Sequence, residues 1–187
     1  MPVTIKENKM TNSYQFTLIL DNVDENTPNL EDALFEAGCD DALINFRNGV
    51  ISLDFERRGN DFEQTILSAI KNIESSGIGT TVKMVTPEHF VNLTDIANRV
   101  GLTTQALSLY VLGKRGDGSF PKPILKIHNK SPLWKWTDVA KWLYEQRKIK
   151  DYQVVDHANI VNDINGALEI RADKKSFNHK KQILANL

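Results

Sequence analysis

Polar and basic side chains gather between residues 91 and 150, and their types suit contact with nucleic acid. Residues 91–150 hold 11 Lys and Arg against 4 Asp and Glu, a net charge of +7. Residues 1–90 hold 7 against 15, a net charge of −8, and residues 151–187 are balanced at 5 against 5. The total of −1 therefore hides an acidic half and a basic segment. A basic patch of this kind is the electrostatic footprint of phosphate binding, although a solvated basic face is the common alternative.

Two short helices joined by a tight turn are predicted at the start of this basic segment. Gly101 stands where such a turn needs a positive φ, and Thr103 or Thr104 is suited to cap the second helix. Apolar residues at helical spacing give each helix one inward face: Leu93, Ile96, Ala97 and Val100 in the first, and Ala106, Leu107, Tyr110 and Val111 in the second. The pattern indicates a helix-turn-helix whose second helix enters the major groove, although an ordinary helical hairpin fits these helices equally well.

The residues after the second helix predict a β-wing and a further helix. Glycines end the second helix, and Pro121 and Pro123 keep the chain extended. Short strands are expected at 124–128 and 133–136, with a turn at 129–132 between them. The last helix is expected from Thr137, with these residues facing inward: Val139, Ala140, Trp142 and Leu143. The tryptophans at 134, 136 and 142 are assigned to core packing rather than to base stacking. Residues 91–150 are therefore predicted to form a winged helix-turn-helix domain.

This arrangement resembles a known group of DNA-binding proteins. Residues 91–149 contain the phrases FPKPI and PLWKWTDVAKWL. With the helix-turn-helix spacing, they resemble the excisionase-like and AlpA-like proteins of the broader MerR-type winged-helix group. The resemblance covers roughly a third of the chain. It implies a winged helix-turn-helix fold and binding to double-stranded DNA, without specifying which promoter or recombination site is bound.

The contacts with DNA are expected from three parts of this domain. Thr104, Gln105 and Ser108 project from the start of the second helix, where glutamine can bind adenine through two hydrogen bonds. Basic residues on the helix exit and the wing are expected near phosphates or a minor groove. The full set of expected contact residues is Arg99, Thr103, Thr104, Gln105, Ser108, Lys114, Arg115, Lys126, His128 and Lys130.

Residues 13–86 predict a separate α+β domain. Asn48-Gly49 between two apolar runs is the strongest short hairpin signal. Thr27-Pro28 is expected to begin a first helix, and Asn60 with Glu63 is expected to form the capping box of a second. The core face of that second helix is expected to be Phe62, Ile66, Leu67, Ala69, Ile70 and Ile73. The order of strand, helix, strand, strand, helix and strand is that of a ferredoxin-like βαββαβ fold with one uncovered sheet face.

Residues 151–187 predict a short helical tail. Apolar residues between 160 and 170 suit one amphipathic helix, in which Gly166 costs roughly 1 kcal/mol relative to alanine. A shorter helix is expected from Phe177 onward. Such helices either mediate dimerisation or pack against their own chain.

The remaining reactive residue types predict neither an enzyme nor a metal site, and no cofactor is expected. The histidines at 89, 128, 157 and 179 lie far apart, and none pairs with Cys39 at a zinc spacing. Cys39 lies among acids, which raise the pKa of a thiol, so a structural cysteine is expected. A single cysteine rules out an internal disulfide and indicates a reducing, cytoplasmic compartment. No apolar run is long enough to span a bilayer, and MPVTIKENKM lacks the apolar core of a signal peptide.

The sequence therefore predicts a cytoplasmic, two-domain, sequence-specific DNA-binding regulator that acts as a repressor or autoregulator. One alternative is an excisionase-like architectural factor that bends DNA, and another is an antitoxin-type regulator that binds a partner protein. A homodimer is expected, because one small module buries too little surface for high specificity. The acidic N-terminal domain is expected to sense, oligomerise or hold a protein partner, or simply to provide a solubilising surface.

Overall fold

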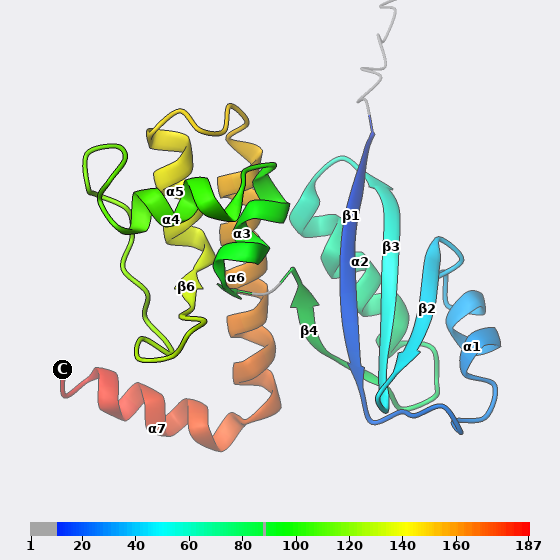
Figure 1. Cartoon of the computed structure of the whole chain (residues 1–187). Helices are drawn as coiled ribbons and strands as arrows, with labels where there is room; N and C mark the ends of the chain where they lie inside the picture. Colours follow the sequence, from blue (N-terminus) through cyan, green and yellow to red (C-terminus); the bar gives the residue numbers. More distant parts are fainter. Residues whose placement is uncertain (1–10, 88) are drawn as a thin grey trace, which may run out of the picture. The chain divides into compact units, whose positions relative to one another are not determined.

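The chain has an α+β fold and divides into two compact units. The computed structural model describes residues 11–87 and 89–187, without the side chains of residues 174–176. Within these residues it contains a four-stranded antiparallel sheet, a two-stranded sheet and seven helices (Figure 1). The first unit consists of the chain up to Thr86 together with Asn165–Leu187, and the second unit is Pro87–Ile164. In the described part of the chain no helix is long and apolar enough to cross a membrane.

The first unit is built on the four-stranded sheet. Its strands are β1 (Asn12–Asp21), β2 (Ala42–Arg47), β3 (Val50–Gly59) and β4 (Thr81–Thr86), in the order β2-β3-β1-β4. Helix α1 (Leu30–Glu36) connects β1 to β2, and α2 (Phe62–Glu74) connects β3 to β4. Leu18 and Leu53 lie opposite each other on β1 and β3, and both are fully buried with Ile66 of α2. The unit's core therefore lies between α2 and one face of the sheet (Figure 1).

Local turn signals in the sequence are confirmed at the β2–β3 hairpin and corrected at both helix starts. Asn48 and Gly49 have φ values of 53° and 74°, the pair of positive values that a type I′ hairpin turn needs. Helix α1 begins at Leu30 rather than at Thr27-Pro28. The reason is that the Thr27 hydroxyl accepts a hydrogen bond from the Asp24 N–H, which closes a separate turn before the helix.

The start and the core face of α2 also differ from expectation. Asp61, not Asn60, caps the helix, because its side chain accepts a hydrogen bond from the Gln64 N–H. Leu67 was expected in the core, but it is 39% exposed. Thr65 is buried in its place, and its hydroxyl donates to the Asp61 carbonyl. The polar Thr65 gave no signal of this burial, since its hydrogen bond is satisfied within the helix itself.

The outer edge of β4 is covered by side chains from α2 and from α6 (Gln153–Ala172). Asn165 of α6 accepts a hydrogen bond from the Val85 N–H and donates to the Val85 carbonyl, both at 2.8 Å. The Val82 N–H donates to Glu74, and the Val82 carbonyl accepts from Arg171. Arg171 also makes two hydrogen bonds to the Glu74 carboxylate. These side chains replace a neighbouring strand, which prevents the edge from pairing with another chain. Helix α7 (Lys174–Leu184) follows.

The second unit contains the predicted pair of short helices. Its elements are β5 (Phe90–Val91), α3 (Leu93–Val100), α4 (Thr104–Val111), β6 (Trp134–Lys135), α5 (Trp136–Glu145) and the first half of α6. Trp134, Trp136 and Trp142 are all at least 94% buried, which confirms their assignment to the core. The inward face expected for α5 is also confirmed, because Val139, Ala140, Trp142 and Leu143 are buried. Val155 and Ala158 of α6 join the same core.

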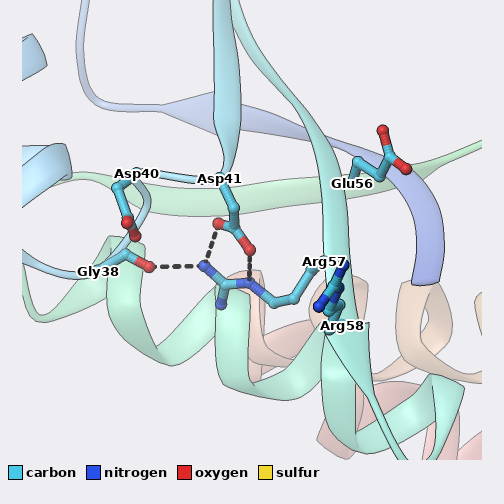
Figure 2. A pocket seen from close by; sticks show the side chains of 6 residues that line it. All are labelled: Gly38, Asp40, Asp41, Glu56, Arg57 and Arg58. Atoms are coloured by element: carbon cyan, nitrogen blue, oxygen red, sulfur yellow. Dashed lines mark hydrogen bonds and ion pairs between the residues drawn. The ribbon is translucent and has the colours of Figure 1, made fainter. Parts of the chain in front are cut away.

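Arg57 is a buried charge in the first unit, and it is held by Asp41 and Gly38. Its guanidinium donates to both carboxylate oxygens of Asp41 at 2.7 Å and to the Gly38 carbonyl at 2.6 Å. Figure 2 shows Arg57 reaching from β3 to these two residues, with Glu56 turned away from them. Cys39 lies buried beside this pair. Burial raises the pKa of the Cys39 thiol, ahead of the effect of its acidic neighbours, which supports a structural role.

We expect Asp41→Asn to lower the free energy of unfolding of the first unit by about 2 kcal/mol, because a buried guanidinium loses its charged partner. The midpoint of urea unfolding should fall, as measured by labelling of Cys39, the single cysteine. Asp40→Asn is the matched control, since Asp40 is exposed and its change should stay within about 0.5 kcal/mol. Equal midpoints for the two variants would contradict a stabilising role for the Arg57–Asp41 pair.

Candidate nucleic-acid interface

The turn between α3 and α4 is fixed by caps on both helices. Asn92 and Asp95 form a capping box at the start of α3, and Gly101 ends that helix with a φ of 68°. The Leu102 N–H returns to the Ala97 carbonyl at 3.1 Å. The Thr103 hydroxyl then accepts a hydrogen bond from the Ala106 N–H, so Thr103 rather than Thr104 caps α4. The positive φ expected at Gly101 is confirmed, and the choice between the two threonines is settled.

The first turn of α4 presents polar side chains to solvent. Thr104 and Gln105 are exposed, whereas Leu107 and Tyr110 are buried in the unit's core. Ser108 is half-buried, and its hydroxyl donates to the Thr104 carbonyl at 2.8 Å. This backbone bond occupies the hydroxyl hydrogen, so Ser108 is a weaker candidate for base contact than Gln105. Val111 was expected to face inward, but it is 37% exposed at the end of the helix.

Two exposed leucines, Leu109 on α4 and Leu112 at its C-cap, follow Gln105 along the helix and are not singled out by the sequence pattern. Leu109 is 40% exposed and Leu112 is 65% exposed. Together with Gln105 they follow a spacing of four and three residues, which places all three on one side of the helix. The spacing of these leucines from Gln105 could have indicated an exposed position. The sequence pattern does not single them out, because apolar residues at helical spacing are normally assigned to the core.

The loop that follows α4 is anchored to α5 through Asp117 and Ser119. Ser119 donates to the Asp117 carboxylate and accepts a hydrogen bond from the indole N–H of Trp142 at 2.9 Å. The hydrogen bonds from Ser119 lower the pKa of Asp117. Lys114 and Arg115 are exposed on this loop, and the Arg115 guanidinium lies 5.3 Å from the centre of the Tyr110 ring. The loop thus holds two of the expected cations at the exit of α4.

The wing differs from the two paired strands that the sequence predicts. Leu125 and Leu133 form a single bridge, and residues 126–131 form turns and bends rather than strand. Residues 134–135 do form a strand, β6, but it pairs with β5 rather than with residues 124–128. Helix α5 starts at Trp136, one residue earlier than expected. The chain turns early because Lys126 adopts a φ of 52° and the Asn129 N–H donates to the Lys126 carbonyl.

The expected contact residues of the wing lie on the turn that replaces the first strand. Lys126, His128 and Lys130 are all exposed. The segment from 118 to 137 contains no aspartate or glutamate, so these side chains have no acidic neighbour within it. Trp134 anchors the segment, because its indole N–H donates to the Pro121 carbonyl at 2.9 Å. The wing is therefore a short, positively charged loop that Trp134 and Pro121 hold in place where it begins and ends.

Arg99 lies in a different environment from the other expected basic contact residues. It is half-buried on α3, and its guanidinium lies 5.0 Å from the centre of the Trp136 ring. Arg99 thus packs on the core, in contrast to the exposed cations of the loop and the wing. Within the described residues no three His, Cys, Asp or Glu side chains form a cluster that could hold a metal ion.

We expect Thr103→Ala to lower the free energy of unfolding of the second unit by about 1 kcal/mol, because it removes the cap of α4. Tryptophan fluorescence during urea unfolding measures this unit alone, since Trp134, Trp136 and Trp142 all belong to it. The matched control is Thr104→Ala, one residue into the helix, which should change the free energy by less than about 0.5 kcal/mol. A larger loss of stability for Thr104→Ala than for Thr103→Ala would contradict the assignment of Thr103 as the cap of α4.

Comparisons with known proteins give no relative for this chain. No family model, no curated protein and no solved structure matches it. The likeness of residues 91–149 to excisionase-like and AlpA-like proteins therefore stays a resemblance of motif and spacing.

Proposed function

We propose that the second unit binds double-stranded DNA with sequence specificity, as a winged helix-turn-helix in which α4 is the recognition helix. The observation that carries the proposal is the capped first turn of α4, where Gln105 is exposed and its side-chain amide makes no hydrogen bond to any other described residue. In helix-turn-helix proteins the first residues of the second helix contact base edges in the major groove. A free amide at this position suits adenine, to which it can make two hydrogen bonds.

The charge of the second unit supports contact with the DNA backbone. Lys114 and Arg115 follow α4 directly, and Lys126 and Lys130 lie exposed on the wing. Lysine and arginine bind phosphates regardless of sequence, and they orient a module so that its recognition helix reaches the bases. We assign the exit loop and the wing to this role.

We further propose that the whole chain is a cytoplasmic transcriptional repressor or autoregulator. The strand order β2-β3-β1-β4, with helices connecting β1 to β2 and β3 to β4, supports a ferredoxin-like arrangement of the first unit. Residues 1–90 have a net charge of −8, which repels DNA, so this part of the chain acts through association or regulation rather than through DNA contact. Selection of duplexes from a random pool by the intact protein tests the function. A shared sequence motif is expected among the selected duplexes, and a pool without enrichment would overturn the proposal.

We expect Gln105→Ala to lower affinity for the selected duplex by about 5- to 150-fold, which corresponds to one lost base contact of about 1–3 kcal/mol. Affinity for a scrambled duplex of the same length should change by less than about twofold, because phosphate contacts remain. Fluorescence anisotropy at fixed salt measures both affinities. Gln153→Ala is the control, since Gln153 is exposed at the start of α6. Equal losses on both duplexes would show that Gln105 contacts phosphate and reads no base.

We expect replacement of Lys126 and Lys130 by alanine to weaken binding to all duplexes. The slope of log affinity against log salt concentration should become shallower by about 1–2 units, since each phosphate contact contributes about 0.9. The matched control replaces Lys71 and Lys83, two exposed lysines of the first unit, and removes the same net charge. An unchanged slope in the wing variant would mean that the wing does not touch DNA.

A further inference from the structure

The two outer edges of the four-stranded sheet differ in how their backbone groups are satisfied. On β4, the Val82 and Val85 backbone groups bind Glu74, Asn165 and Arg171. On β2, no described side chain or strand takes this place beyond β3. One edge is closed by side chains from two helices. At the other edge α1 is drawn beside β2 in Figure 1, but among the described residues it provides no hydrogen bond to β2.

The register of the β2–β3 hairpin shows which groups of β2 face outward. Arg47 and Val50 flank a two-residue turn, so they form a hydrogen-bonded pair across the hairpin. The Glu56 N–H donates to the Asp41 carbonyl, which fits the same alternation. The backbone groups of the even-numbered residues therefore point away from β3. Those of Ile44 and Phe46 have no hydrogen-bond partner among the described residues, whereas the Ala42 N–H already donates to the Cys39 carbonyl at 3.1 Å. Unpaired backbone groups of this kind are open to solvent, because burying them would be costly.

The side chains of β2 do not block this edge. Soluble proteins protect exposed edges with lysine, proline or a bulge. The strand reads ALINFR, and its register with β3 is regular throughout. Leu43 is 66% exposed and Phe46 is 43% exposed. An open edge with exposed apolar residues and none of these protective features is suited to pair with another strand.

We propose that two copies of this chain pair through β2, edge to edge and antiparallel, with Ile44 opposite Ile44 of the second copy. Two four-stranded sheets would then form one sheet of eight strands. Residues whose backbone N–H and C=O groups point outward must lie opposite each other in the new pair. Only registers that place even-numbered residues opposite even-numbered residues are therefore allowed. The register centred on Ile44 is one of these.

Charge and side-chain size select this register among those allowed. It places Arg47 opposite Asp41 of the second copy, at the end of the strand where Asp40 and Asp41 line a shallow pocket (Figure 2). The Asp41 carboxylate already accepts two hydrogen bonds from Arg57, and it has further lone pairs for a second guanidinium. It also places Phe46 opposite the small Ala42 on the same face. A slip of two residues would set Arg47 opposite Cys39 or Leu43 and lose the charge pair. The occupant is therefore a second copy, because the strand is complementary to itself in charge and in size.

The mass of the intact protein in solution, without DNA, tests the proposal independently of the proposed function. Light scattering should give about twice the chain mass of 21.2 kDa. Leu43→Lys should yield a monomer, because it places two cations close together across the new pair. Ile44→Pro should also yield a monomer, because proline at an outward-facing edge position removes the N–H that the second copy needs while leaving the pairing with β3 intact. Circular dichroism checks that both variants are folded.

The control is Met84→Lys. Met84 is an exposed apolar residue on β4, at the other edge of the same sheet, and its replacement should leave the dimer intact. A monomeric wild-type protein would overturn the proposal. A dimer that survives both β2 substitutions would also overturn it, by assigning the interface to another surface.

Cysteine cross-linking tests the register. Ile44→Cys should form a disulfide between copies in glutathione buffer, because a hydrogen-bonded antiparallel pair has Cα atoms about 5.5 Å apart. Asn45→Cys should cross-link at least about tenfold more slowly, because Asn45 opposes Leu43 of the second copy and the two introduced cysteines are diagonal neighbours about 7–8 Å apart. The wild-type protein gives the background rate of cross-linking through its buried Cys39. Equal rates at positions 44 and 45 would overturn the proposed pairing.

Discussion

Trp142 holds together the segments on which the second unit depends. Its ring lies 5.2 Å from the centre of Tyr110 on α4 and 4.9 Å from that of Phe120 at the base of the wing. Its indole N–H binds Ser119 in the loop between them. Buried aromatic rings contribute large apolar areas and prefer tilted contacts such as these. One side chain of α5 thus sets where α4 ends and where the wing begins.

Features that depend on neighbouring residues were predictable from the sequence. The Asn48-Gly49 turn needs two residues with positive φ, and the Gly101 turn needs one, so both follow from residue type. The buried stripe of α5 follows from helical spacing, as does the burial of Leu107 and Tyr110 on α4, whereas Val111 is exposed. The exposed position of Gln105 follows from the same spacing, because it lies off the stripe that contains Leu107 and Tyr110. Most of the expected contact residues therefore lie on exposed segments of one unit.

Features that depend on distant residues could not be predicted in this way. The wing was expected as a hairpin of two strands, but β6 pairs with β5, which lies more than 40 residues earlier in the chain. Arg57 carries no local signal of burial in the sequence, yet it is buried and bound by Asp41 and Gly38. The side chains that close the edge of β4 come from residues 74, 165 and 171. No local rule connects these positions, because the pairing is decided by tertiary geometry.

The closure of β4 by α6 has a consequence for synthesis on the ribosome. Asn165 lies 80 residues beyond Val85, so it is made after all of β1 to β4 and after the whole of α5. At about 5–20 residues per second, the edge of β4 waits roughly 4–16 s for the side chain that covers it. During this interval the nascent sheet has two open edges in place of one. The first unit is therefore finished last, although most of its residues emerge first.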